Sequence, residues 1–365
     1  MTALQPPLTL CIINFNGAEH LRGAFAALAA QDWVFAEIVV VDNASQDESG
    51  VVVRELCPQA RFIRLPENLG PGAARNVGFA SAQYELVLFQ DNDVRLNRGT
   101  VERLVNRLIG QATGTQQHAL AIAPRVLYAS DPETVQFDSA DCHFLGLMAT
   151  RNADKPASRA DTASPGGTAC ETTSLVTACF LIDRKRWHAA ALFDEDLGFN
   201  LEDHDFGVRA RVAGHPLWVE PAATVLHGSG TPGLSYRPGE QPSEQRLFYL
   251  VRNRWIVISK CYATRTLVLL APALLFYELM QLTWLLRQGQ GRVWWRALRE
   301  VTRQRRSIFA ARRDVQSSRL SRDATILRDA PLPVTRHVRQ QGSRYLLEGG
   351  ERLLRGYWHL VRPWV

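Results

Sequence analysis

The chain has 365 residues, of which 46% are hydrophobic, so disorder along its whole length is excluded and a large domain with an appendage is expected. The net charge of +6 divides unevenly, because residues 1–245 carry a net −10 and residues 246–365 a net +16. This division predicts an acidic body and a basic arm for an anionic partner, either nucleic acid or anionic lipid.

The cysteines and the first residues bear on location. The six cysteines show neither a CxxC pair nor the spacing of metal ligands, which indicates a reducing compartment. Residues 1–7 have neither the basic nor the apolar segment of a secretory signal. We therefore expect a cytoplasmic protein.

Strands and helices alternate in the first half of the chain. Buried strands are predicted for the apolar runs 8–15, 37–42, 60–65 and 84–89, and helices for 18–30, 47–57 and 72–82. This order predicts βαβ units in an α/β, mostly parallel sheet with helices on both faces. Residues 128–175 are rich in Ser, Thr, Asp, Gly and Pro, and are expected to form an excursion or mobile loop. Regular structure is expected to return at 174–182, 203–213 and 216–220.

The last third is helical in pattern. Residues 266–286 are long and apolar enough to span a bilayer. Pro272, Glu278 and Gln281 interrupt that run, and a spanning helix would place residues 1–245 outside the cytoplasm. A helix lying in the membrane plane avoids this conflict.

A basic amphipathic helix is predicted next, over 292–313. Its apolar face carries Trp294 and Ala297, and its other face carries several arginines. This pattern favours an anionic membrane surface. The alternative is a helix packed on the rest of the protein with a solvated basic face.

Polar residues follow three of the predicted strands. They are Asn14 and Asn16 after the first, Asp42 and Asn43 after the second, and Asp91, Asn92 and Asp93 after the fourth. Because parallel strands end at one edge of a sheet, these groups are expected to gather where ligands bind. The DxD carboxylates Asp91 and Asp93 suit a divalent ion that neutralises a diphosphate. A polar turn that opens the following helix is the alternative.

Further candidates lie outside this DxD. Asp42 is expected to accept hydrogen bonds from a base or ribose; an Asx-turn is the alternative. Arg75 is expected to pair with a diphosphate; an ordinary surface salt bridge is the alternative. Glu202 and Asp203 begin a predicted helix, either as an acidic first turn or as a general base for an acceptor hydroxyl. His227 ends a strand before a Gly-rich loop, so metal ligation is a hypothesis.

Taken together, these segments resemble glycosyltransferase family 2, and in particular its rhamnosyltransferase-like members. The resemblance covers most of residues 8–260 and rests on the order and spacing of IINFNG, EIVVVDNASQD, ENLGPGAARNVGFASA, VLFQDNDVRL, LFDEDLGFNLEDHDFGVRARVAGH, LHGSG and FYLVRNR. It implies a GT-A fold, a nucleotide-sugar donor and a Mg²⁺ or Mn²⁺ ion.

The resemblance also implies residue roles. Asp203 would be the base, with Glu202 beside it binding the acceptor. Asp93, Asp91 and His227 would form the metal site. The expected donor contacts are Asn14, Asn16, Asp42, Asn43, Arg75, Asp91 and Asn92.

The implied activity is inverting transfer of a sugar to a cell-surface glycan or lipid-linked acceptor. The expected domains are a catalytic domain over 1–245, membrane-associating helices over 246–330 and a basic helical tail over 331–365. The protein is expected to be peripheral or monotopic on the inner face of the plasma membrane.

Other classes of protein compete with this interpretation. A non-catalytic scaffold that binds a nucleotide or glycan at the membrane is the main alternative. A nucleic-acid binder is disfavoured by the acidic body and the lack of a recognition motif. A dinucleotide-dependent oxidoreductase is disfavoured because no GxGxxG follows the first strand.

Overall fold

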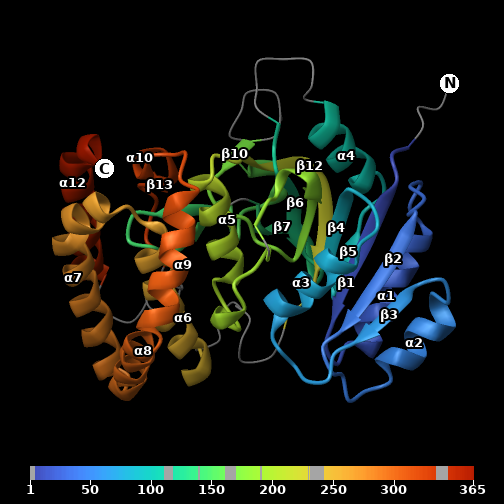
Figure 1. Cartoon of the computed structure of the whole chain (residues 1–365), viewed down its shortest axis with the longest axis horizontal. Helices are drawn as coiled ribbons and strands as arrows, with labels where there is room; N and C mark the ends of the chain where they lie inside the picture. Colours follow the sequence, from blue (N-terminus) through green and yellow to red (C-terminus); the bar gives the residue numbers. More distant parts are fainter. Residues whose placement is uncertain are drawn as a thin grey trace. The chain divides into compact units, whose positions relative to one another are not determined.

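The computed structural model describes residues 5–110, 118–138, 140–160, 170–189, 191–228, 230, 242–333 and 344–365, without the side chains of 344–347. The chain forms two compact units. The first, called the α/β unit, comprises residues 1–140, 150–206 and 216–230. The second, called the helical unit, comprises residues 141–149, 207–215 and 231–365. Figure 1 labels most of the elements of both units.

Among the described residues, the α/β unit holds a ten-stranded sheet. Its order is β10-β12-β6-β11-β4-β1-β2-β3, with β5 paired to β12 and β7 to β6. Its strands are β1 (Leu8–Asn14), β2 (Glu37–Asp42), β3 (Arg61–Arg64), β4 (Leu86–Asp91), β5 (Val94–Leu96), β6 (Ala121–Tyr128), β7 (Asp131–Phe137), β10 (Cys170–Thr172), β11 (Cys179–Asp183) and β12 (Leu217–His227).

Strand direction sets where side chains gather. β3, β2, β1 and β4 are parallel neighbours. β11 is antiparallel to both β4 and β6, and β12 is parallel to β6. Strands β6 and β12 therefore run in the same direction as β4. The carboxyl ends of β1, β2, β4, β6 and β12 consequently lie at one edge of the sheet, which we call the carboxyl edge.

Helices cover both faces because strand residues alternate in direction. Leu8, Leu10 and Ile12 of β1 join a core with side chains of three helices: α1 (Ala18–Ala29), α2 (Ser49–Leu56) and α4 (Thr100–Ile109). Cys11 points to the other face, where α3 (Pro71–Ser81) packs. Gly78 of α3 lies against Cys11, and a Cβ there would collide with the Cys11 sulfur. The expected α/β fold is confirmed.

The segment expected as an excursion or mobile loop contains regular strands, so that expectation was wrong in part. Besides β7 and β10, it holds β8 (Ala140–His143) and β9 (Met148–Thr150), which form a three-stranded sheet with β13 (Leu327–Arg328). Short apolar pieces within a Ser/Thr/Gly-rich background hide such strands from pattern analysis. Residues 161–169 lie outside the described part of the chain.

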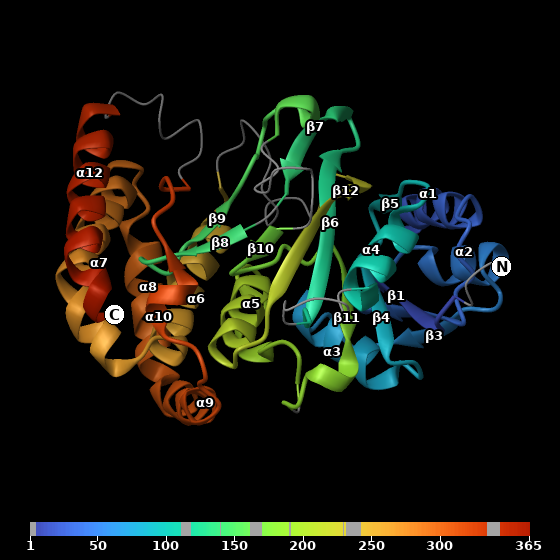
Figure 2. The same ribbon diagram turned by 90° about the horizontal axis from the view of Figure 1, so that it is seen from above.

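The helical unit is built around two apolar clusters. Its helices are α6 (Glu244–Cys261), α7 (Thr264–Arg287), α8 (Gly291–Arg303), α9 (Arg305–Ser317), α10 (Asp323–Ile326) and α12 (Arg344–Val361). The larger cluster includes Phe144, Tyr262, Leu270 and Trp358. α7 and α12 run side by side (Figure 2), joined by a 2.7 Å hydrogen bond from the Tyr357 hydroxyl to the Leu269 carbonyl.

The apolar face expected on residues 292–313 is already occupied. Val293 and Ala297 of α8 are buried in the smaller cluster with Leu247 and Val251 of α6. The indole N–H of Trp294 donates to Glu278 at 2.8 Å. This face therefore packs inside the helical unit and is not free to enter a membrane.

Helix α7 matches the apolar run predicted at 266–286. In the described part of the chain, it is the one helix whose length and composition would allow it to cross a membrane. Only 28% of its most apolar 18-residue window is buried. Pro272 is accommodated within the helix.

Candidate functional site

A buried polar network begins the site at the ends of β1 and β2. The Asn14 side chain donates to an Asp42 oxygen at 2.8 Å and to the Ser45 hydroxyl at 3.1 Å. The Ser45 hydroxyl in turn donates a hydrogen bond to Asp42. The Ser45 backbone N–H donates a second one to the Asp42 carboxylate at 3.1 Å. Asn14 and Asp42 are fully buried. These contacts hold the Asp42 carboxylate in one position at the carboxyl edge.

Close approach of three loops extends this network. Asn92 donates to the Asn14 side-chain oxygen at 2.8 Å. Asn16 adopts a left-handed backbone (φ 46°) and accepts the Gln46 N–H at 2.7 Å. A Cβ on Gly17 would collide with Asn92 and Asn14, so only glycine fits between them.

The backbone N–H of Asn43 donates to the Asn14 carbonyl at 2.8 Å, but the Asn43 side chain points to other partners. Its side chain donates to Asn68 at 2.8 Å and to the Gly70 carbonyl at 3.1 Å, and accepts the Leu69 N–H at 3.0 Å. It therefore positions the loop that precedes α3. A direct contact of Asn43 with a donor stays a prediction.

Arg75 connects two acidic groups that are far apart in the sequence. It is 3% exposed and contacts Asp91 at 2.5 Å and Glu202 at 3.8 Å. It also donates to the Thr177 carbonyl at 3.0 Å. One guanidinium thus joins the DxD at the end of β4 to the acidic start of α5 (Glu202–Val212). A contact of Arg75 with a diphosphate stays a prediction.

Asp93 and His227 form the second pair of the DxD region. Nε2 of His227 lies 3.4 Å from an Asp93 oxygen, and the Gly230 N–H donates to the other oxygen at 2.9 Å. Burial opposes ionisation of Asp93, but His227 and Gly230 outweigh it and hold the pKa of Asp93 at about 2. Burial likewise opposes protonation of His227, whereas Asp93 raises the pKa of His227 above its usual value.

Gln136 fixes the orientation of His227, and sequence analysis missed it. Its side-chain oxygen is 2.7 Å from Nδ1 of His227. Since this oxygen only accepts, Nδ1 carries the proton and Nε2 faces Asp93. Gln136 lies on β7, within the segment read as a loop, so the sequence offered no signal for it.

The donor set of Asp93 and His227 fits a divalent cation. A lone pair on Nε2 facing a carboxylate is unfavourable unless a proton or a cation lies between them. Among the described residues, no group of three or more His, Cys, Asp or Glu side chains could hold a metal. The protein would therefore supply two ligands and a bound diphosphate the others, which is how Mg²⁺ is often held. Asp91 is ion-paired with Arg75, and its role as a ligand stays a prediction.

The acidic pair at the start of α5 is held in a strained turn. Asn200 and Leu201 adopt left-handed backbones (φ 63° and 65°), which is uncommon for leucine and typical of functional sites. Glu202 is buried, whereas Asp203 is partly exposed. Burial and the neighbouring Asp203 raise the pKa of Glu202, and burial raises that of Asp203 to a smaller extent. The two carboxyls therefore differ in protonation near neutral pH, which suits one acid and one base.

Three buried polar atoms at this junction make no hydrogen bond within the described residues. They are Oε2 of Glu202 and Nε and Nη1 of Arg75, none of which makes a hydrogen bond there. Such atoms are costly unless a ligand or water satisfies them. Their position between Asp91 and Glu202 makes this junction a candidate binding site.

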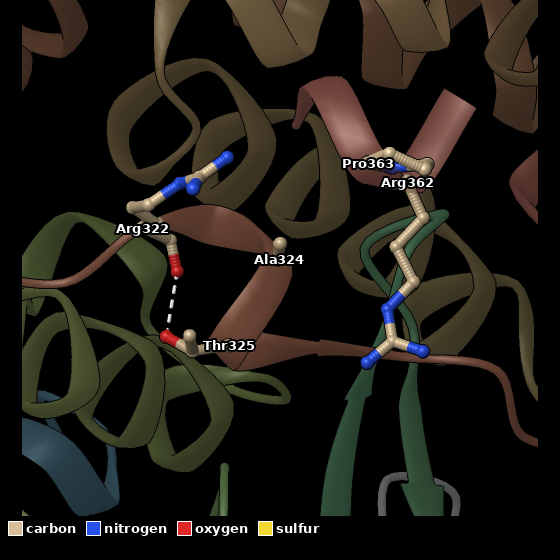
Figure 3. Close-up of a pocket in the computed structure, with 5 residues that line it drawn as sticks. All are labelled: Arg322, Ala324, Thr325, Arg362 and Pro363. Carbon is tan, nitrogen blue, oxygen red and sulfur yellow. Dashed lines mark hydrogen bonds between the residues drawn. The ribbon is translucent and has the colours of Figure 1, made fainter.

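The helical unit has an open pocket of its own. It has a volume of about 390 Å³ and is lined by Arg322, Ala324, Thr325, Arg362 and Pro363 (Figure 3). It contains no carboxylate and none of the residues predicted from the sequence. We therefore place the candidate active site at the carboxyl edge of the α/β unit.

Comparison with known proteins shows which family the first third of the chain resembles. The family described as "Glycosyl transferase family 2" matches residues 9–125. The succinoglycan biosynthesis protein ExoO of Rhizobium meliloti (strain 1021) is 32% identical over 112 residues, 30% of this chain and 32% of that protein. The GalNAc(5)-diNAcBac-PP-undecaprenol beta-1,3-glucosyltransferase of Campylobacter jejuni serotype O:2 is 31% identical over 107 residues, 28% of this chain and 35% of that protein. The chain thus spans about a third of each relative's length.

The fold has relatives among solved structures. The crystal structure of GalNAc-T7 with UDP, GalNAc and Mn²⁺ superposes with a TM-score of 0.55 at 15% identity, covering 72% of this chain and 49% of that chain. This likeness supports a GT-A-like α/β fold. The rhamnosyltransferase-like subtype stays a prediction. Residues 9–125 of the chain are thus similar to glycosyltransferase family 2.

Proposed function

We propose that this chain is an inverting glycosyltransferase that moves a sugar from a nucleotide-sugar to a glycan or lipid-linked acceptor. The observation that carries the proposal is the junction made by Arg75, which contacts both Asp91 and Glu202. It brings a DxD that suits a diphosphate and an acidic pair that suits an acceptor to one edge of one sheet. A transferase needs these two halves within reach of the same anomeric carbon.

The donor is assigned to the polar network around Asp42. The fixed Asp42 carboxylate and the Asn14, Asn16 and Asn92 amides would accept and donate hydrogen bonds to the nucleoside. Asp93 and His227 would hold a Mg²⁺ or Mn²⁺ ion, which would neutralise the leaving diphosphate. UDP and Mn²⁺ named with the GalNAc-T7 structure are ligands of this same class.

Asp203 is assigned as the base. It is the more exposed member of the acidic pair and the one whose pKa rises less, so it is ionised near neutral pH. It would take the proton of an acceptor hydroxyl while that oxygen attacks the anomeric carbon and the bond to the diphosphate breaks. Glu202, held protonated by burial, would donate a hydrogen bond to the acceptor. A single displacement of this kind inverts the anomeric configuration.

The acceptor is assigned as an intermediate of envelope polysaccharide synthesis, reached at the inner face of the plasma membrane. The names of the two curated relatives point to succinoglycan biosynthesis and to an undecaprenol-linked glycan. The net +16 of residues 246–365 suits an anionic membrane surface.

A turnover assay tests the proposal. Nucleotide-sugars of several bases and sugars are incubated with the full chain, Mn²⁺ and extracted membrane lipids, and release of nucleoside diphosphate and labelled lipid is measured. We expect one donor to turn over in wild type and none in the Asp93→Ala variant. Nucleotide binding without turnover of any donor would instead support the non-catalytic scaffold.

A further inference from the structure

Helix α7 has two faces with opposite surroundings. Its buried face carries Leu270, Ala273, Leu274, Glu278 and Leu285. Its other face carries four large apolar side chains that are 55–70% exposed: Val268, Leu275, Leu279 and Leu286. At 100° per residue these four positions fall within about 40° of one another around the helix axis, over a length of about 27 Å. We call them the α7 stripe.

The ends of α7 are basic. Arg265 and Arg287 are exposed, and Glu278 is the only other charged residue of the helix. The apolar stripe is therefore bounded at both ends by positive charge. An apolar face flanked by arginines is typical of a helix that lies in the interface of a membrane.

Exposed charge in the helical unit is almost entirely positive. Within the described residues, its exposed acidic side chains are Glu244 and Asp314. Its exposed arginines are Arg265, Arg287, Arg292, Arg296, Arg299, Arg303, Arg305, Arg306, Arg313, Arg322, Arg352, Arg355 and Arg362. Trp295 is 66% exposed and belongs to α8, the helix that carries Arg292, Arg296, Arg299 and Arg303. This excess of positive charge favours contact with an anionic surface and disfavours contact with a second copy of the unit.

The buried face of α7 decides between lying on a membrane and spanning it. Glu278 is 6% exposed and ion-paired with Arg254, which is fully buried. Arg254 also donates to the Leu145 carbonyl at 2.6 Å. A spanning α7 would have to leave these partners, placing Glu278 in hydrocarbon and leaving Arg254 buried without a counter-charge.

We propose that the α7 stripe is a lipid-docking surface that lies in the plane of an anionic bilayer. The stripe enters the interface, the arginines contact lipid phosphates, and Glu278 stays within the protein. The exposure of the α7 stripe follows from contacts within the helical unit alone and does not depend on the proposed function. Its use in presenting a lipid-linked acceptor rests on the proposed function.

Vesicle binding tests this surface. The full chain is floated with vesicles of phosphatidylcholine and phosphatidylglycerol, and with phosphatidylcholine alone. We expect binding to the anionic vesicles, release by high salt or an alkaline wash, and a loss of at least about tenfold in Leu275→Asp/Leu279→Asp. Val34→Asp, at a 79% exposed apolar position of the α/β unit, is the matched control and should bind like wild type. Since all these sites are exposed, thermal stability should be unchanged.

Several results would overturn the proposal. Binding that persists in the stripe variant places the contact elsewhere, and no binding to anionic vesicles removes the lipid. A bound fraction that resists the alkaline wash would mean that α7 spans. If wild type is a dimer and Leu275→Asp/Leu279→Asp is a monomer, a second copy of the chain covers the stripe. Nucleoside diphosphate binding, measured on the same variants, separates any of these results from failure of the donor site.

Discussion

The two units of the molecule differ in where most of their charged side chains lie. At the carboxyl edge of the α/β unit, the ionisable side chains are mostly buried and held by partners, as Asp93 is by His227 and Gly230. In the helical unit, arginines and large apolar side chains lie on the surface, and Arg254 and Glu278 form a buried ion pair. Fixed, desolvated charges suit chemistry, because their positions and pKa values are set in advance. Exposed charges beside apolar groups suit association with a surface.

The largest effect expected from this difference is loss of the base. Asp203→Asn keeps the shape of the side chain and removes its ability to accept a proton, so transfer should fall by about 10³-fold or more. Binding of nucleoside diphosphate, measured by calorimetry, should change little, because the proposed role of Asp203 is on the acceptor side. Normal turnover in this variant would refute the base assignment.

The next effect concerns stability in the helical unit. Glu278→Gln leaves the buried Arg254 without its carboxylate and should lower the free energy of unfolding by about 3 kcal/mol, measured by urea denaturation. Glu244→Gln, at an exposed position of the same unit, should stay within about 0.5 kcal/mol of wild type. Equal values for the two variants would show that the ion pair does not stabilise the fold.

A smaller effect is expected from the residue that orients His227. Gln136→Ala removes the acceptor of the Nδ1 proton and should weaken Mn²⁺ binding by about 10–100-fold, measured by the electron paramagnetic resonance of free Mn²⁺ in the presence of nucleoside diphosphate. Gln136→Glu keeps an acceptor and should retain most of the affinity. If alanine binds Mn²⁺ as wild type does, His227 is not a ligand.

The smallest effect is the pH dependence of the base. Burial raises the pKa of Asp203 to about 6, so the carboxyl is protonated, and inactive as a base, at a higher pH than an ordinary aspartate. The rate should be constant between this value and about pH 8, where Glu202 loses its proton, and should fall about tenfold for each pH unit below pH 6. Nucleoside diphosphate binding over the same range serves as the control. A rate that stays constant down to pH 4.5 would contradict the assignment.

The sequence predicted most of the α/β unit because its signals are local. Apolar runs and the polar residues that follow them place β1, β2 and β4 and their ends, and the motifs name Asp42, Asp91 and Asp93. The link between Asp91 and Glu202 through Arg75 could not be read, since it joins residues over a hundred positions apart. Gln136 was missed because it lies 91 positions from His227, in a segment that the sequence predicts as a loop.

The helical unit was harder to interpret. Residues 292–313 were read as one amphipathic helix with a membrane face, but α8 and α9 are separate helices and the face of α8 is buried. Periodicity identifies an apolar face without saying what covers it. The domain boundary expected near residue 245 stays a prediction.

The central claim is that the carboxyl edge binds a nucleoside diphosphate through Asp93 and a divalent ion. Thermal unfolding of wild type and Asp93→Ala with a panel of nucleoside diphosphates, with and without Mn²⁺, tests it most directly. A ligand at 100 times its Kd adds about 2.7 kcal/mol of stability. We predict that one nucleotide stabilises wild type only with Mn²⁺, and that the variant loses this gain. Folded wild type that no nucleotide stabilises would contradict the claim.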